Sequence, residues 1–180
     1  MKKYWQAVLL MVLSFFTLSC TEPFDCLNCH APQEAPPNIS PTVIKDFAKQ
    51  GVNLMPTGEY LKIVLPADKF FLTNAPTLKE DKKPALMQVA DLLKHYGPEA
   101  SVRVEGFTDT IADDSSSRQL SLYRAQAVLA YLWSQGLDAE HLYAVGLGKT
   151  HLVADPQDVT ANAANRRVEI VVHAYCTTCY

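Results

Sequence analysis

Five cysteines carry the most evident chemistry in this chain of 180 residues. Four of them form two Cys-x-x-Cys pairs, Cys26 with Cys29 and Cys176 with Cys179, one near each end. Four cysteines allow three disulfide connectivities. The two connectivities that join the ends would close a loop of roughly 150 residues. Such a disulfide would stabilise the fold by about 4–5 kcal/mol, because it lowers the entropy of the unfolded chain. Two local disulfides, a four-thiolate zinc site and uninvolved free thiols are the alternatives. Disulfides are favoured if the chain is exported.

A histidine follows the first pair, so Cys26-Leu27-Asn28-Cys29-His30 matches the attachment pattern of c-type haem. That chemistry needs two thioether links, His30 as an axial ligand and an apolar pocket around the porphyrin. The surrounding segment is rich in proline and offers no such pocket, and no second ligand is evident. A haem electron-transfer protein is therefore the weaker interpretation, and we expect no cofactor and no metal.

The fifth cysteine follows a pattern typical of exported proteins. Lys2 and Lys3 precede an almost wholly apolar stretch of twelve residues that ends at Leu18. A helix of that length rises about 18 Å, too short to cross roughly 30 Å of hydrocarbon. Residues 1–19 are therefore predicted to be a secretory signal peptide. A plain cleaved signal peptide with an incidental cysteine is one possibility.

The end of this segment, Leu18-Ser19-Cys20, resembles a bacterial lipobox, in which the cysteine is acylated and becomes the new N-terminus. The resemblance implies lipidation of Cys20. Several acyl chains would hold the protein at a membrane almost permanently. Thr21, in place of an aspartate, favours the outer membrane with the protein facing the periplasm.

Residues 20–58 are predicted to be a tether between the lipid and a folded domain. Proline fixes φ and removes a hydrogen-bond donor, so the proline-rich part should not fold alone.

The overall composition, 48% hydrophobic and 19% charged, suits one packed domain. The net charge of −3 gives no indication of a nucleic-acid partner.

Residues 59–175 alternate between strand and helix patterns. Strands are predicted over 59–65, 102–105, 142–145 and 167–173. Apolar residues at helical spacing predict one helix between Pro84 and Gly97 and a second from about Ser117 to Gln135. The order strand, helix, strand, helix, strand, strand predicts an α/β fold, an α+β sandwich with both helices packed on a mixed four-stranded sheet. Residues 176–180 form a short tail with the second Cys pair.

Several short motifs occur in order along this region: Gly106-Phe107-Thr108-Asp109, Leu120-Ser121, Arg124-Ala125, Tyr131-Leu132, Gly146-Leu147-Gly148 and Asn165-Arg166-Arg167-Val168-Glu169-Ile170. Together they resemble the C-terminal domain of outer-membrane protein A, which peptidoglycan-associated lipoprotein and flagellar stator proteins share. The resemblance covers about residues 60–172. It implies a βαβαββ domain that binds the diaminopimelate of the peptidoglycan stem peptide without cleaving it. We therefore expect no enzyme activity.

The same resemblance implies three binding residues: Asp109, Arg124 fifteen residues further on, and Asn74 after the first strand. Diaminopimelate presents an ammonium and a carboxylate on one centre. Asp109 supplies an anion for the first, Arg124 a planar fork of donors for the second, and Asn74 a neutral hydrogen bond. Taken alone each residue is ordinary, since an Asp after a strand is usually a turn residue and a helical Arg is usually solvated.

Two positions depart from the family pattern. Ala112 stands where glycine is usual, and Ser117 where asparagine is usual. Both bear on the conformation and affinity of the loop rather than on the fold. Arg166 and Arg167 could line the same cleft or fix the last strand through carbonyl contacts, and we favour the structural role.

Two functions follow from the resemblance. The chain could be a non-catalytic tether, with its lipid in the outer membrane and its domain on peptidoglycan. It could also be a structural subunit that docks a larger envelope machine on the wall, or that has lost wall binding. Small lipoproteins with this domain occur in the type IVB (Dot/Icm) secretion apparatus, and one of them resembles this chain in size and layout. Its partners would then include other subunits of that complex.

Overall fold

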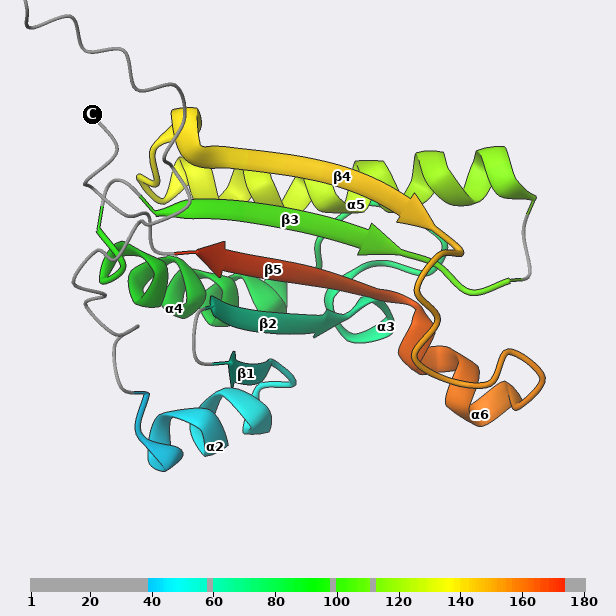
Figure 1. The fold of residues 1–180 in the computed structure, drawn as a ribbon, viewed down its shortest axis with the longest axis horizontal. Helices are drawn as coiled ribbons and strands as arrows, with labels where there is room; N and C mark the ends of the chain where they lie inside the picture. Colours follow the sequence, from blue (N-terminus) through cyan, green and yellow to red (C-terminus); the bar gives the residue numbers. More distant parts are fainter. Residues whose placement is uncertain (1–38, 58–59, 98–99, 111–112, 174–180) are drawn as a thin grey trace, which may run out of the picture.

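The computed structural model describes residues 39–57, 60–97, 100–110 and 113–173, and within them one mixed sheet organises the fold. The strand order is β1-β2-β5-β3-β4. β3 and β4 run parallel, and all other neighbours are antiparallel (Figure 1). The strands are β1 (Asn53–Thr57), β2 (Tyr60–Pro66), β3 (Ser101–Phe107), β4 (Leu142–Gly148) and β5 (Arg167–His173).

Two long helices lie on the same face of this sheet (Figure 1). They are α4 (Lys83–Lys94) and α5 (Asp114–Ser134), and α5 joins the parallel strands β3 and β4. The predicted α/β class and the helix layer are confirmed. The shorter helices are α2 (Pro41–Lys49), α3 (Ala67–Phe70) and α6 (Val159–Asn162), with 3-10 turns at Glu80–Lys82, Ala139–His141 and Ala163–Asn165.

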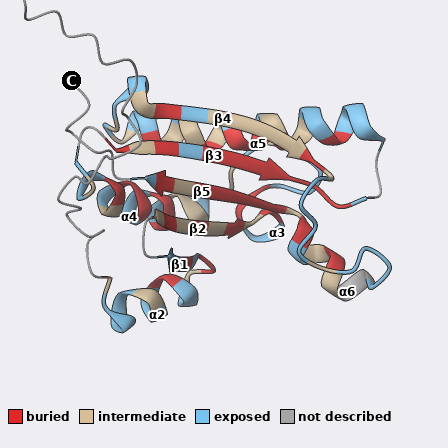
Figure 2. Ribbon diagram, viewed as in Figure 1, coloured by how far each residue is buried: buried red, intermediate tan, exposed pale blue. Residues whose placement is uncertain are grey.

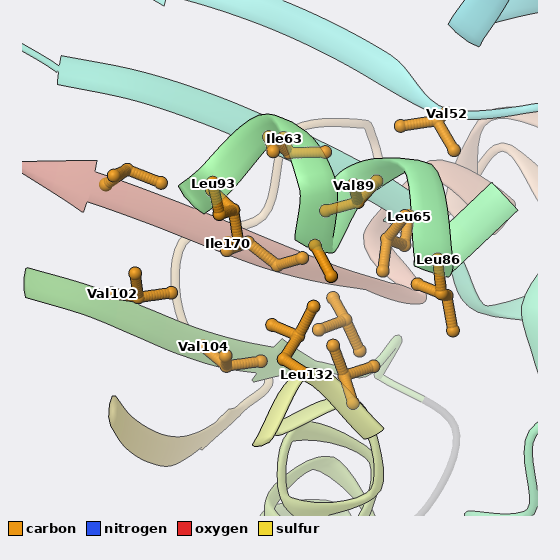
Figure 3. Close-up of a cluster of buried hydrophobic side chains, with 14 of the residues drawn as sticks. Val52, Ile63, Leu65, Leu86, Val89, Leu93, Val102, Val104, Leu132 and Ile170 are labelled. Carbon is orange, nitrogen blue, oxygen red and sulfur yellow. The ribbon is translucent and has the colours of Figure 1, made fainter. Parts of the chain in front are cut away.

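The hydrophobic core fills the space between the sheet and the two long helices. Every second residue of the central strands points into it, because side chains alternate across a strand. Ile63 of β2, Val104 of β3 and Ile170 of β5 are fully buried there (Figures 2 and 3). The helices contribute residues at three- and four-residue spacing: Leu86, Val89 and Leu93 from α4, and Val128 and Leu132 from α5.

The sheet has five strands rather than the predicted four, and the folded part begins earlier than predicted. Both α2 and β1 lie within residues 20–58, which the sequence pattern assigned to the tether. The Ser40 side chain caps α2 by accepting a hydrogen bond from the Val43 N–H at 3.4 Å. β1 pairs with β2 at the edge of the sheet, where a strand tolerates an internal proline such as Pro56.

The helix α5 also begins three residues before the predicted start at Ser117. Asp113 is its N-cap, and its carboxylate accepts a hydrogen bond from the Ser116 N–H at 2.9 Å. That bond holds the pKa of Asp113 well below its usual range. The loop between β3 and α5 is therefore shorter than predicted.

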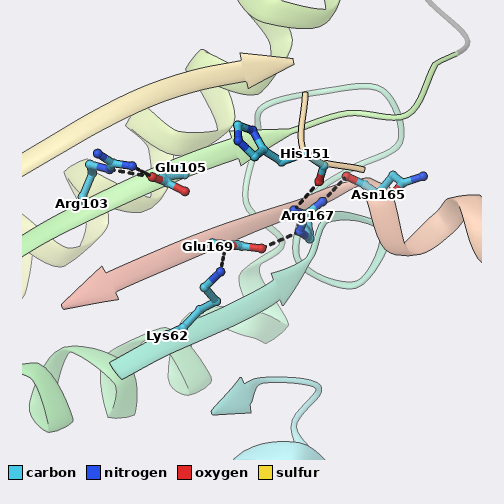
Figure 4. A network of polar contacts seen from close by, with 7 residues as sticks. All are labelled: Lys62, Arg103, Glu105, His151, Asn165, Arg167 and Glu169. Carbon is cyan, nitrogen blue, oxygen red and sulfur yellow. Dashed lines mark hydrogen bonds and ion pairs between the residues drawn. The ribbon is translucent and has the colours of Figure 1, made fainter. Parts of the chain in front are cut away.

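A charged network crosses the sheet face that α4 and α5 leave open (Figure 4). The buried Arg167 donates to Glu169 at 2.7 Å, to the carbonyl oxygen of His151 at 3.0 Å and to that of Asn165 at 3.4 Å. Its guanidinium also lies 4.0 Å from the centre of the Phe107 ring. Arg167 therefore fixes the start of the last strand through the carbonyl contacts that the sequence analysis favoured.

Candidate functional site

Asp109 lies on the loop that leaves β3, at the end of the sheet where β2 also ends and β5 begins. Thr108, just before it, donates its N–H to the carbonyl oxygen of Gly148 at 2.8 Å, which fixes the loop to the end of β4. Asp109 is only 8% exposed. A carboxylate this far from water needs a partner of opposite charge or a set of hydrogen-bond donors.

Arg124 approaches the same end of the sheet from α5 and is 4% exposed. Its Nε donates to the carbonyl oxygen of Ala75 at 3.2 Å, and its guanidinium lies 5.5 Å from the centre of the Phe71 ring. Burial lowers the pKa of Arg124, while the charges of Asp68 and Asp109 act in the opposite direction. An arginine keeps its proton under such conditions, so the site holds a desolvated cation.

Arg166 completes the group, although the sequence analysis favoured a structural role for it. Its guanidinium donates to Asp109 at 2.8 Å and to both oxygens of Asp68, at 3.0 and 2.5 Å. The two carboxylates raise the pKa of Arg166 above its usual range, and the bond from Arg166 lowers that of Asp68. Asp68 is thus the site residue that the sequence did not single out, and Arg166 takes the cleft position that the sequence analysis left as the less favoured of its two roles.

Asn74 lies on the loop that follows α3, one residue before the Ala75 carbonyl that Arg124 contacts. Its φ of 52° is in the left-handed region, where asparagine is among the few residues that fit readily. The loop closes on itself through Leu72, whose N–H donates to the Thr77 carbonyl oxygen at 3.0 Å. The structure therefore brings the loop of Asn74 to the site, with the Asn74 side chain exposed.

The four charged side chains form a balanced set: the anions Asp68 and Asp109, and the cations Arg124 and Arg166. Such a set suits a ligand that itself carries both charges, since an ammonium can approach the carboxylates and a carboxylate the guanidinium groups. Ser117, at one of the positions that depart from the family pattern, is 1% exposed and its hydroxyl has no hydrogen-bond partner. Ala112 lies outside the described residues.

The cysteine predictions, for Cys20, Cys26, Cys29, Cys176 and Cys179, also fall outside the described residues and stay predictions. In the described part of the chain, no group of three or more His, Cys, Asp and Glu side chains is arranged to hold a metal ion. None of the helices described is long and apolar enough to cross a membrane.

A family model described as the OmpA family matches residues 70–166, more than half of the chain. The chain belongs to the OmpA family. The matched range includes Asn74, Asp109, Arg124 and Arg166, whereas Asp68 lies just outside it. As an OmpA-family member the chain has relatives among lipoproteins and among peptidoglycan-binding proteins.

Two relatives and one solved structure are among the proteins similar to this chain. The probable lipoprotein YiaD of Escherichia coli strain K12 is 34% identical over 122 residues, covering 68% of this chain and 55% of that protein. The peptidoglycan-binding protein ArfA of Mycobacterium tuberculosis strain H37Rv is 40% identical over 88 residues, covering 49% and 27%. The cell wall anchor of the T6SS from Pseudomonas aeruginosa has a similar structure, with a TM-score of 0.68 at 28% identity, covering 78% of this chain and 99% of that one. The chain spans about half the length of the curated relatives it matches, or less.

Proposed function

We propose that this chain is a non-catalytic lipoprotein of the outer membrane that binds peptidoglycan through the diaminopimelate of the stem peptide. The observation that carries the proposal is that Asp109 and Arg124, which come from different elements and are 8% and 4% exposed, lie close enough for their charges to interact. Removing two such charged groups from water costs free energy. A ligand that places a cation against Asp109 and an anion against Arg124 offsets that cost.

The chemistry of diaminopimelate matches this arrangement. Its free amino-acid head carries an ammonium and a carboxylate on the same carbon. The carboxylate would take the planar donor fork of Arg124, and the ammonium would lie against Asp109. The proposal also accords with the names of two relatives, a peptidoglycan-binding protein and a cell wall anchor.

Pull-down of the purified mature protein by isolated sacculi tests the proposal. We expect Asp109→Asn and Arg124→Gln each to weaken the association by about tenfold or more, because a hydrogen bond to a charged group contributes roughly 1.5–3 kcal/mol. Arg118→Gln is the matched control, since Arg118 is an exposed arginine of the same helix. Circular dichroism of each variant checks the fold. If Asp109→Asn and Arg124→Gln were pulled down as well as Arg118→Gln, the role of Asp109 and Arg124 in binding would be refuted.

A second proposal concerns the context in which the domain acts. The structural likeness to the cell wall anchor of a secretion system favours a role as the wall-docking subunit of a larger envelope machine. Co-purification from native membranes distinguishes the two. Recovery in a large assembly would support the machine, and recovery as a single lipoprotein would support the simple tether.

A further inference from the structure

Arg166 changes the net charge of the site. It donates to Asp109 at 2.8 Å, so Asp109 and Arg166 together are close to neutral. A neutral pair attracts an ammonium weakly. If Asp109, Arg166 and Arg124 were the only charged groups, the site would carry a net positive charge and would favour a ligand with carboxylates alone.

Asp68 removes this imbalance. Both of its oxygens accept hydrogen bonds from Arg166, in the two-point geometry that suits a guanidinium. The main chains are held together as well, because the Ala67 N–H donates to the carbonyl oxygen of Arg166 at 2.8 Å. Asp68 is ionised at neutral pH, and the hydrogen bonds from Arg166 lower its pKa below the ordinary carboxyl value. With Asp68 present, the Asp109 side of the site has one net negative charge and Arg124 stands opposite as a cation.

We propose that Asp68 is a specificity-determining residue: by offsetting Arg166, it makes the site select a ligand with an ammonium beside its carboxylate over a ligand with carboxylates alone. The inference rests on the proposed function, in which this site binds diaminopimelate. Asp68 acts through Arg166 and the local charge. It is half-exposed, with a side chain 54% accessible, so its effect on selectivity is moderate.

Two soluble probes isolate this effect: diaminopimelate, and pimelate, the same dicarboxylate without its amino groups. Calorimetric titration of the full mature chain gives the ratio of the two affinities. We expect the wild type to prefer diaminopimelate and Asp68→Asn to reduce that preference by about two- to fivefold, the range for a half-exposed charge pair. Asp91→Asn, which removes an exposed carboxylate paired only with Lys94 on α4, should leave the ratio unchanged.

A rescue separates charge balance from a merely structural role. The double variant Asp68→Asn with Arg166→Gln removes both the offsetting anion and the cation, so Arg166 no longer offsets the negative charge of Asp109 and the preference should return. Arg166→Gln alone should increase the preference. Neither result is expected if Asp68 only holds α3 in place.

The outcomes are distinguishable. A wild type that binds neither probe, or both equally, overturns the proposed function and this inference with it. A wild-type preference that survives Asp68→Asn overturns the inference alone. A preference lost in Asp68→Asn and not restored in the double variant assigns Asp68 a structural role, which also overturns it.

Discussion

At the scale of single residues, two consecutive arginines act at different sites because a strand begins between them. Arg167 is the first residue of β5 and points to the open face of the sheet, where it meets Glu169 two residues further on. Arg166 precedes the strand, and its side chain turns toward Asp109 and Asp68. One cation therefore fixes the sheet, and its neighbour sets the charge of the candidate site.

The Glu169 carboxylate predicts a dependence of stability on pH. Burial alone would raise the pKa of Glu169, but the hydrogen bonds from Lys62 and Arg167 outweigh it and lower the pKa from 4.5. A group with a lowered folded pKa contributes stability above its unfolded pKa and loses it as the pH falls. We expect the free energy of unfolding in urea to decrease below about pH 4.5, and to decrease less steeply in Glu169→Gln.

Glu80→Gln is the control for this measurement, because Glu80 is 82% exposed and paired only with Lys83. Its pH profile should follow that of the wild type. If Glu169→Gln also followed the wild type, the ion pairs of the open face would not stabilise the fold.

At the scale of elements, two glycines let α5 lie very close to the parallel strands. A Cβ at Gly106 of β3 would overlap the carbonyl oxygen of Ser121, and one at Gly146 of β4 would lie 2.6 Å from that of Arg118. Gly106 precedes Asp109 by three residues, and Ser121 precedes Arg124 by three. The close approach of helix and strand therefore determines how the two binding residues face each other.

We expect Gly106→Ala to lower the free energy of unfolding by about 3 kcal/mol, because the added methyl group must push α5 from the sheet. Pull-down by sacculi should weaken as well, since Arg124 moves with the helix. Gly136→Ala is the control: with φ at +94° and nothing within 4 Å, it should cost only about 1 kcal/mol of backbone strain and leave binding intact. Wild-type binding by Gly106→Ala would show that helix position does not control the site.

The sequence predicted the elements whose signals are local. Alternation identified β2, β3 and β5, and helical spacing identified α4 and α5. The sequence patterns missed the one-turn helices α3 and α6 and, within the predicted tether, α2 and β1, which each contain a proline, Pro41 and Pro56, that indicated a linker. Pro41 follows the capping Ser40 and is a favourable helix start, so a signal for α2 was present.

The sequence did not reveal Asp68 or its pairing with Arg166, because that pairing is a long-range contact. Asp68 and Arg166 are 98 residues apart, and neither lies in a periodic pattern that indicates its partner. Only the antiparallel pairing of β2 with β5, which places Pro66 opposite Arg167, brings them together. Asp109 and Arg124 could be predicted from the sequence because a family motif surrounds each of them.

At the scale of the whole molecule, the candidate site and the start of α2 lie at opposite ends of the domain. The loops after β2 and β3 and the start of β5 form the site end, whereas α2 begins at the end where β5 finishes (Figure 1). A chain anchored through Cys20 would thus present its binding end away from the membrane. The length of the segment before α2 then determines how far the site reaches.

Shortening that segment should separate membrane attachment from wall binding. Deleting residues 23–37 leaves Cys20, Thr21 and all of the described residues, and removes a stretch that would span about 45 Å if extended as a proline-rich chain. We expect the variant to stay in the outer membrane and, as a soluble purified domain, to bind isolated sacculi like the wild type. In intact cells its chemical cross-linking to peptidoglycan should fall sharply, because the anchored domain no longer reaches the wall.

A Gly-Ser segment of equal length should restore cross-linking, since reach rather than sequence is required. Full cross-linking in the deletion variant would contradict the model of a domain held at the end of a spacer, and a failure of the Gly-Ser variant would direct attention to the Cys26–Cys29 pair that both changes remove.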